Sequence, residues 1–205
     1  MHGIHEVLNF WFGEESKQRW FKPDPAFDQE VRRRFAELFA RAATGDFRSW
    51  ETTAEGCLAL CILLDQMPRN MFRGDARAFA TDGRALGVAE HAIKEGFDQE
   101  LSHERKQFLY LPFMHSENLA NQLRCLALFE TQGLHEGRKH AEEHVAIIRR
   151  FGRFPHRNAA LGRSTTEAEA QFLQDEGRTS GQEPPLGPMT DHRPDGSARS
   201  GIGKT

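Results

Sequence analysis

The chain has 205 residues and a formal net charge of −3. A slightly acidic chain lacks the basic surface that neutralises phosphates, so its composition argues against nucleic acid as a general partner. Sixteen Phe and three Trp against one Tyr predict a core rich in purely apolar rings, in a chain long enough to be stable without disulfides or metal.

The start of the chain and its apolar runs bear on the compartment. No positively charged segment followed by an apolar stretch opens the chain, so no secretory signal is predicted. The longest apolar run, residues 57–64, is less than half of the ~20 residues that a membrane span needs. The three cysteines, Cys57, Cys61 and Cys125, are expected to be buried thiols and not disulfide partners. We therefore expect a cytoplasmic protein with no membrane partner.

Apolar residues recur at spacings of three and four, and alternating β-branched runs are absent, which predicts helices along the whole chain. A first helix is expected to end at Gly13. Asp24 followed by Pro25 is typical of an N-cap and a first-turn proline, and predicts a second helix that ends at Gly45.

A third helix is expected to be the central one. Thr52 and Glu55 match a capping box, and the helix is predicted to run to about Gln66, with Pro68 ending it. Residues 57–64 are apolar nearly all round the helix. A helix without a polar face must be covered on most sides, so it should lie inside the fold.

Five further helices are predicted after the central one. They are a helix from Asp82 to Gly96, a stretch at His103–Tyr110 interrupted at Pro112, a helix begun by Ser116 and Glu117 that stops before Gly133, a helix over 136–151, and a short one begun by a capping box of Thr166 and Glu169. The fold class is therefore all-α, an antiparallel array of about seven helices. Residues 1–176 are expected to form one globular domain. Residues 177–205, rich in Gly, Pro, Ser and charge, are expected to be a disordered tail.

Two motif matches are interpreted as incidental. Residues 198–205 fit a relaxed phosphate-binding loop, but neither a strand before it nor a helix after it is predicted. Residues 140–144 fit the inverted zinc-protease pattern His-x-x-Glu-His, but no third ligand follows. No metal site is therefore predicted.

Three short segments, residues 64–73, 110–118 and 149–158, are dense in polar residues. In the first and third, an Arg–Asn pair follows a proline. A guanidinium offers a rigid fork of donors to a carboxylate or phosphate, and a helix start adds backbone N–H groups. If the segments meet, they would form an anion pocket. The candidate ligand-binding residues are Asp65, Arg69, Asn70, Arg157 and Asn158, and the candidate catalytic residues are His115, Glu117 and His156. One of the two histidines would transfer a proton, oriented by one of the acidic side chains.

The same residues also have a purely structural interpretation. An Arg–Asn pair after a proline can bond the last carbonyls of a helix and hold loops together. Asp65 could likewise form a buried ion pair with Arg69 or Arg157. The two interpretations differ in whether the tips of Arg69, His115 and Arg157 point into one pocket.

These segments resemble the bacterial domain-of-unknown-function family 924. The stretches that carry the resemblance are 9–13, 20–21, 63–70, 108–117 and 151–158, within a match from about residue 5 to residue 175. Met67 stands where the family motif usually has Phe, and Asn121 where an acidic residue is common. The resemblance implies an all-α, tetratricopeptide-like fold and brings no activity with it.

Three hypotheses about function remain open. The first is a site that binds or hydrolyses a small anionic ligand. The second is a helical-repeat scaffold without catalytic activity that holds a protein partner on a concave face, an analogy from fold alone. The third is a metal-assisted enzyme that uses His115, Glu117, His144 and His156.

Overall fold

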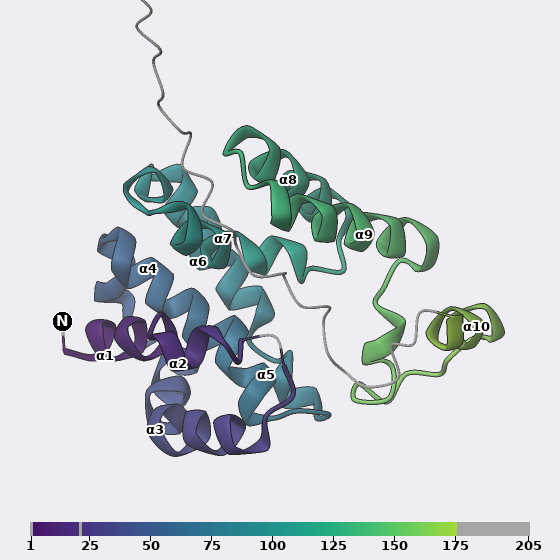
Figure 1. The fold of residues 1–205 in the computed structure, drawn as a ribbon, viewed down its shortest axis with the longest axis horizontal. Coiled ribbons are helices and arrows are strands. Elements are labelled where there is room, and N and C mark those ends of the chain that lie inside the picture. The colour runs from purple at the N-terminus through teal and green to yellow at the C-terminus, as the bar shows by residue number, and fades with distance from the viewer. Residues whose placement is uncertain (1, 21, 176–205) are drawn as a thin grey trace, which may run out of the picture.

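The computed structural model describes residues 2–20 and 22–175 (Figure 1). In these two stretches every regular element is a helix and no strand occurs, which confirms the predicted all-α class. The predicted tail and the phosphate-loop-like end lie outside the described residues.

The main helices are α1 (His2–Trp11), α2 (Glu14–Lys17), α3 (Pro25–Thr44), α4 (Ala54–Cys61), α5 (Met67–Met71), α6 (Asp82–Lys94), α7 (His103–Met114), α8 (Leu119–Thr131), α9 (His135–Phe151) and α10 (Glu167–Asp175). The short elements are η1 (Arg48–Thr52), η2 (Ile62–Gln66), η3 (Ala76–Ala78), η4 (Phe97–Glu100) and η5 (Pro155–Arg157).

Two of the predicted helix starts are confirmed by their hydrogen bonds. The Asp24 side chain accepts from the backbone N–H groups of residues 26 and 27, both at 3.0 Å, and Pro25 is the first residue of α3. Thr166 N–H donates to Glu169 Oε2 at 2.7 Å while Glu169 N–H donates to Thr166 Oγ1 at 3.3 Å. This reciprocal pair is the capping box that the spacing predicts.

Other helix starts differ from the prediction. The N-cap of α4 is Thr53 and not Thr52, because Thr53 Oγ1 accepts from Gly56 N–H at 3.2 Å. Glu55 forms an ion pair with Arg105 at 2.8 Å instead of closing a capping box. Likewise α8 begins after Asn118, whose side chain caps it, and not at Ser116 and Glu117.

The prediction that Pro68 ends the central helix is wrong. Helix α4 continues through one π-helical turn, η2, into α5, and Pro68 lies in the first turn of α5. Proline has no N–H to donate to the carbonyl four residues earlier, at Leu64. Thr81 Oγ1 donates to that carbonyl in its place. Pro112 likewise lies inside α7, which runs on to Met114.

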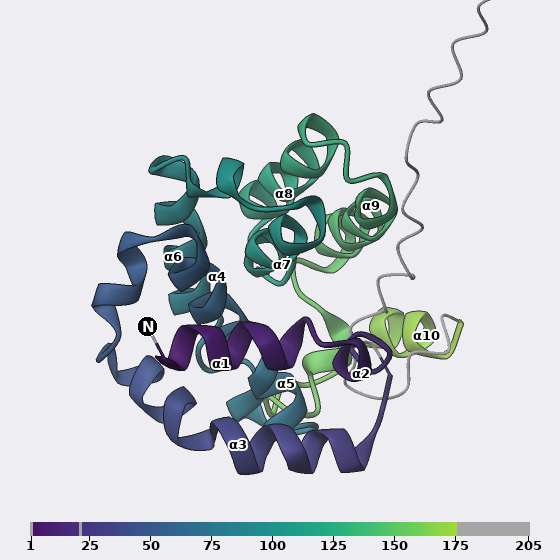
Figure 2. The same ribbon diagram turned by 60° about the vertical axis from the view of Figure 1, so that its left-hand side comes forward.

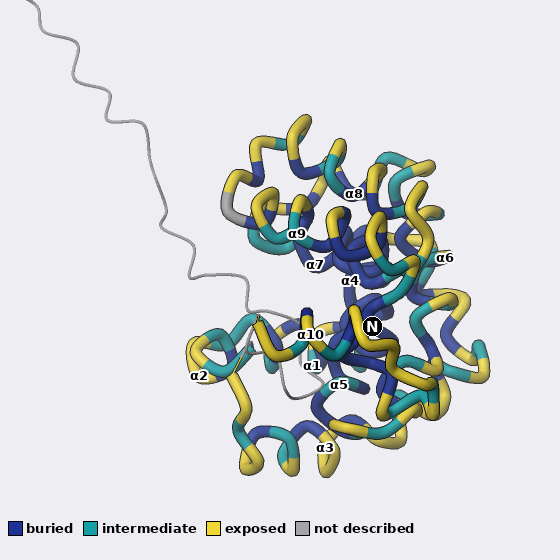
Figure 3. The backbone as a smooth tube through the Cα atoms, turned by 90° about the vertical axis from the view of Figure 1, so that its right-hand side faces the viewer, coloured by how far each residue is buried: buried dark blue, intermediate teal, exposed yellow. Residues whose placement is uncertain are grey.

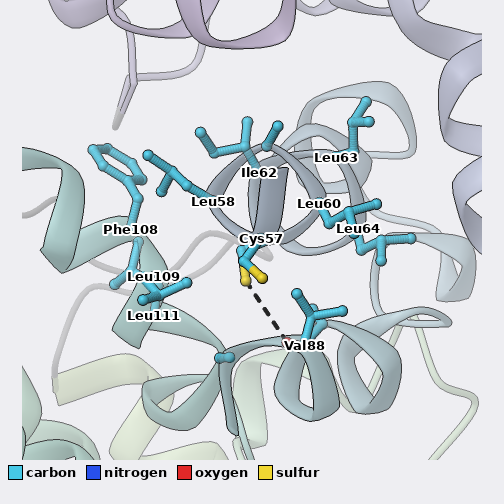
Figure 4. Close-up of a cluster of buried hydrophobic side chains, with 14 of the residues drawn as sticks. Cys57, Leu58, Leu60, Ile62, Leu63, Leu64, Val88, Phe108, Leu109 and Leu111 are labelled. Atoms are coloured by element: carbon cyan, nitrogen blue, oxygen red, sulfur yellow. Dashed lines mark hydrogen bonds between the residues drawn. The ribbon is translucent and has the colours of Figure 1, made fainter. Parts of the chain in front are cut away.

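The central position of α4 is confirmed. Every residue from Cys57 to Leu64 is fully buried, and α4 contacts α1, α6 and α7. Figure 4 looks along this helix, with Leu58, Ile62 and Leu63 radiating from its axis. Figure 3 shows the same stretch as a buried column inside the exposed outer helices. The three cysteines are buried free thiols, and burial raises the pKa of Cys57 to about 12.

The C-terminal elements form a second, smaller apolar cluster. Helices α8 and α9 lie side by side in both ribbon views (Figures 1 and 2). Beyond α9 the chain turns back through η5 to α10. The buried residues of this cluster are Ile147 and Ile148 of α9, Phe154 before η5, and Phe172 of α10. Among the residues that the structure describes, no helix has both the length and the apolar character needed to cross a bilayer.

Candidate functional site

Asp65 and His115 form a buried pair that joins the first and second polar segments. Asp65 lies in the π-helical turn η2 and His115 caps the end of α7. His115 Nδ1 lies 2.7 Å from Asp65 Oδ1 and 2.9 Å from Oδ2. A carboxylate at Nδ1 fixes the orientation of an imidazole ring and favours the tautomer with a proton on Nδ1. The pair therefore has the geometry of an oriented acid–base group.

Arg69 connects this pair to Asp82, a residue that the sequence suggested only as the start of a helix. Its two terminal nitrogens each lie 3.0 Å from an oxygen of Asp82, and Nη1 lies 3.3 Å from Asp65 Oδ1 and also donates to the Asp65 carbonyl. Burial and the neighbouring Asp65 raise the pKa of Asp82, and they outweigh the opposing effect of Arg69 and Arg157. The two guanidinium groups therefore offset part of the effect of burial on the pKa of Asp82.

Arg157 brings the third polar segment to the same place. Its Nη1 donates to the His115 carbonyl at 3.0 Å and lies 3.5 Å from Asp82 Oδ2. The guanidinium carbon lies 4.7 Å from the ring centre of Phe79 and 4.5 Å from that of Phe154. Both distances are in the range of cation–π contacts, which fix the plane of the guanidinium.

Glu117 ties the loop between α7 and α8 to the third segment. It accepts from Phe154 N–H at 2.8 Å and from both terminal nitrogens of Arg163, at 2.7 and 3.0 Å. Burial alone would raise the pKa of Glu117, but the bonds from Arg163 and from Phe154 N–H hold it below the usual value. Glu117 is therefore an ionised partner of Arg163.

Three other proposed site residues have contacts with further parts of the fold. Asn70 Nδ2 donates to Asp28 Oδ1 at 2.8 Å, on the side of α3. Asn158 Nδ2 lies 3.3 Å from Thr165 Oγ1 and 3.4 Å from Glu169 Oε2, in the C-terminal cluster. The His156 ring packs 5.4 Å from the ring of Phe154. The bonds of Asn70 and Asn158 thus hold α3 and the C-terminal cluster.

A cleft of about 280 Å³ lies beside the cluster. It is lined by Phe79, Asp82, Gly83, Leu86, Pro112, His115, Ser116, Glu117, Arg157 and Leu161. These residues come from the start of α6, the end of α7 and the η5 segment. The volume is just below the 300–1,000 Å³ of typical ligand pockets, which suits a small molecule.

The charged groups of the cleft differ in how far they reach solvent. The side chains of Asp82 and Glu117 are 17% and 28% exposed, whereas that of Arg157 is 3% exposed. The guanidinium of Arg157 is therefore the most buried of the three charged groups that line the cleft.

The histidines that suggested a metal-assisted reaction serve other contacts. His144 Nδ1 lies 2.8 Å from the His140 carbonyl, and its ring packs 5.2 Å from that of Phe154. Within the described part of the chain, no three His, Cys, Asp or Glu side chains are grouped so that they could hold a metal ion.

The fold and site define an all-α protein with a buried carboxylate, histidine and arginine network beside a small cleft. The family model for "Bacterial protein of unknown function (DUF924)" matches residues 7–177, so the chain belongs to this family. The solved structure of ATU0120, a protein of unknown function from Agrobacterium tumefaciens, is 43% identical and has a TM-score of 0.79 over 84% of this chain and 97% of that chain. The comparison with curated proteins gave no match. The resemblance seen in the sequence motifs is thereby confirmed.

Proposed function

We propose that the cleft binds a small, partly apolar molecule through an anionic group. The single observation that supports this proposal best is that His115 and Arg157, 42 residues apart in the sequence, line the same cleft. Arg157 lines the cleft with charge-assisted donors, and a guanidinium stacked on two rings is well suited to a carboxylate or phosphate. Phe79, Leu86 and Leu161 supply apolar wall.

His115, held by Asp65 at Nδ1, is the imidazole that lines the cleft, and an imidazole is a common proton-transfer group. Asp65 acts on the ligand only through the imidazole, so it is a positioning residue. If the ligand is hydrolysed in the cleft, His115 is the proposed acid or base.

The scaffold hypothesis has weaker support. Leu119 and Leu123, one helical turn apart on α8, are 39% and 40% exposed. Apolar side chains exposed singly or in pairs are normal on a protein surface. The cleft, which combines apolar wall and buried charge, is the better candidate.

Two glycines on α6 allow a matched test of the cleft. Gly83 lines the cleft and Gly87 does not, and in both cases a Cβ atom would meet nothing within 4 Å. Gly83→Leu should fill the cleft, and Gly87→Leu should leave it open. Both changes place a good helix former in a helix, so neither should destabilise the fold.

The test is a thermal-shift screen of phosphorylated and carboxylated metabolites on wild type, Gly83→Leu and Gly87→Leu. A compound present at one hundred times its Kd adds about 2.7 kcal/mol to the free energy of unfolding, which raises the melting temperature by roughly 5–10 °C. We expect this shift in wild type and Gly87→Leu and its loss in Gly83→Leu. A compound that stabilises all three proteins equally binds elsewhere and contradicts the proposal.

A further inference from the structure

The charges around the cleft balance one another before any ligand is added. The acidic members are Asp65, Asp82 and Glu117, and the basic members are Arg69, Arg157 and Arg163. Each carboxylate lies within 3.5 Å of at least one guanidinium nitrogen. Counted without His115, these six groups carry three negative and three positive charges. An anion without a counter-charge would therefore leave them with an unbalanced negative charge in a partly desolvated place, where charge is costly.

The placement of the charges points the same way. The carboxylates of Asp82 and Glu117 reach solvent more than the guanidinium of Arg157, and all three side chains line the cleft. An acid group bound at Arg157 without a positive charge is repelled by both of these neighbouring carboxylates. A ligand that also carries an ammonium group is attracted by them, and it keeps the balance of charge when it is bound.

We infer that the ligand is a small zwitterion of the amino-acid type, with its acid group on Arg157, its ammonium group between Asp82 and Glu117, and an apolar side chain on Phe79 and Leu86. This inference rests on the proposed binding in the cleft and adds the chemical class of the ligand. The apolar wall favours an uncharged, branched or aromatic side chain over a polar one. The small volume of the cleft excludes a peptide of several residues as an enclosed ligand.

The test removes one charge at a time from the ligand, because Asp82 holds Arg69 and its replacement would disturb the fold. The probes are leucine, isoleucine, valine, methionine and phenylalanine, each with its deamino acid and its decarboxylated amine. Leucine, for example, is matched with 4-methylpentanoate and 3-methylbutylamine. Affinities are measured by thermal shift and by calorimetric titration on wild type, Gly83→Leu and Gly87→Leu.

We expect at least one of these amino acids to stabilise wild type and Gly87→Leu but not Gly83→Leu. Its deamino acid and its amine should each bind about tenfold more weakly or worse, since each lacks one charge-assisted interaction.

A deamino acid that binds as tightly as its amino acid overturns the zwitterion inference and leaves the proposed function standing. An amine that binds as tightly as its amino acid overturns both the zwitterion and the anionic contact with Arg157. If none of these probes stabilises the wild type while a metabolite of the earlier screen does, the inference fails alone. If neither screen yields a compound that Gly83→Leu rejects, the proposed function fails as well.

Discussion

Asp65 is a completely buried carboxylate, and such a group is tolerated only when its oxygens are bonded and its charge is matched. Here His115 lies at both oxygens, and the guanidinium of Arg69 lies 3.3 Å from one of them. Removing Asp65 would leave buried His115 Nδ1 without its partner and would leave Arg69 with Asp82 as its acidic neighbour. The network thus holds together η2, the start of α6 and the end of α7.

We therefore expect Asp65→Ala to lower the free energy of unfolding by about 3–5 kcal/mol, measured by urea denaturation. The matched control is Glu90→Ala. Its ion pair with Arg124 is long, at 3.5 Å, and both side chains are nearly half exposed. Such surface pairs contribute at most about 1 kcal/mol. Equal effects of the two substitutions would show that the Asp65 network does not stabilise the fold.

The sequence identifies the polar segments that lie at the cleft, but it does not identify which side chains of each segment contact one another there. Arg69 and Asn70 are adjacent and chemically suited to one site, yet Arg69 points to Asp82 and Asn70 to Asp28. Successive residues on a helix point about 100° apart, so an adjacent pair rarely serves one pocket. Arg157 and Asn158 separate in the same way. Side-chain direction depends on the neighbouring helix, which no local pattern encodes.

At the scale of elements, the continuous path from α4 to α5 depends on a partner from another helix. Pro68 cannot donate to the Leu64 carbonyl, and Thr81 Oγ1 does so. Single π-helical turns occur often at functional sites. Here the turn contains Asp65, so the irregular backbone holds one of the carboxylates of the polar network.

We expect Thr81→Val to lower the free energy of unfolding by about 1–3 kcal/mol, because it removes the donor and leaves the shape nearly unchanged. In a Pro68→Ala background the new backbone N–H can serve the same carbonyl, so Thr81→Val should cost less there. A double-mutant cycle measured by urea denaturation gives this coupling. Additive effects of the two substitutions would contradict the compensation.

Local signals account for the elements that the sequence predicts correctly. The Asp24 and Thr166 caps bond only residues two or three positions away, so their sequence patterns suffice. The continuation past Pro68 could not be predicted, because the compensating hydroxyl lies 17 residues from the carbonyl it serves. The sequence around Pro68 does not show that this donor is present.

At the scale of the molecule, the cleft lies where the C-terminal cluster joins the main core. Two polar connections hold this junction, one from Arg157 to Asp82 and the His115 carbonyl, the other from Glu117 to Arg163 and the backbone of Phe154. The residues that these bonds join are 37 to 75 positions apart in the sequence. The all-α class and the buried central helix follow from the apolar pattern alone. The cleft does not, because it depends on these long-range contacts.

The most direct test of the central claim is amide hydrogen exchange of the wild type, with and without the most stabilising compound of the two screens. A ligand in the cleft contacts the start of α6, the end of α7 and the η5 segment at once. We therefore expect slower exchange in peptides that cover residues 79–86, 112–117 and 155–161 together, and no change in these peptides for Gly83→Leu. Protection confined to one of the three segments, or to the outer faces of α8 and α9, would contradict a shared binding cleft.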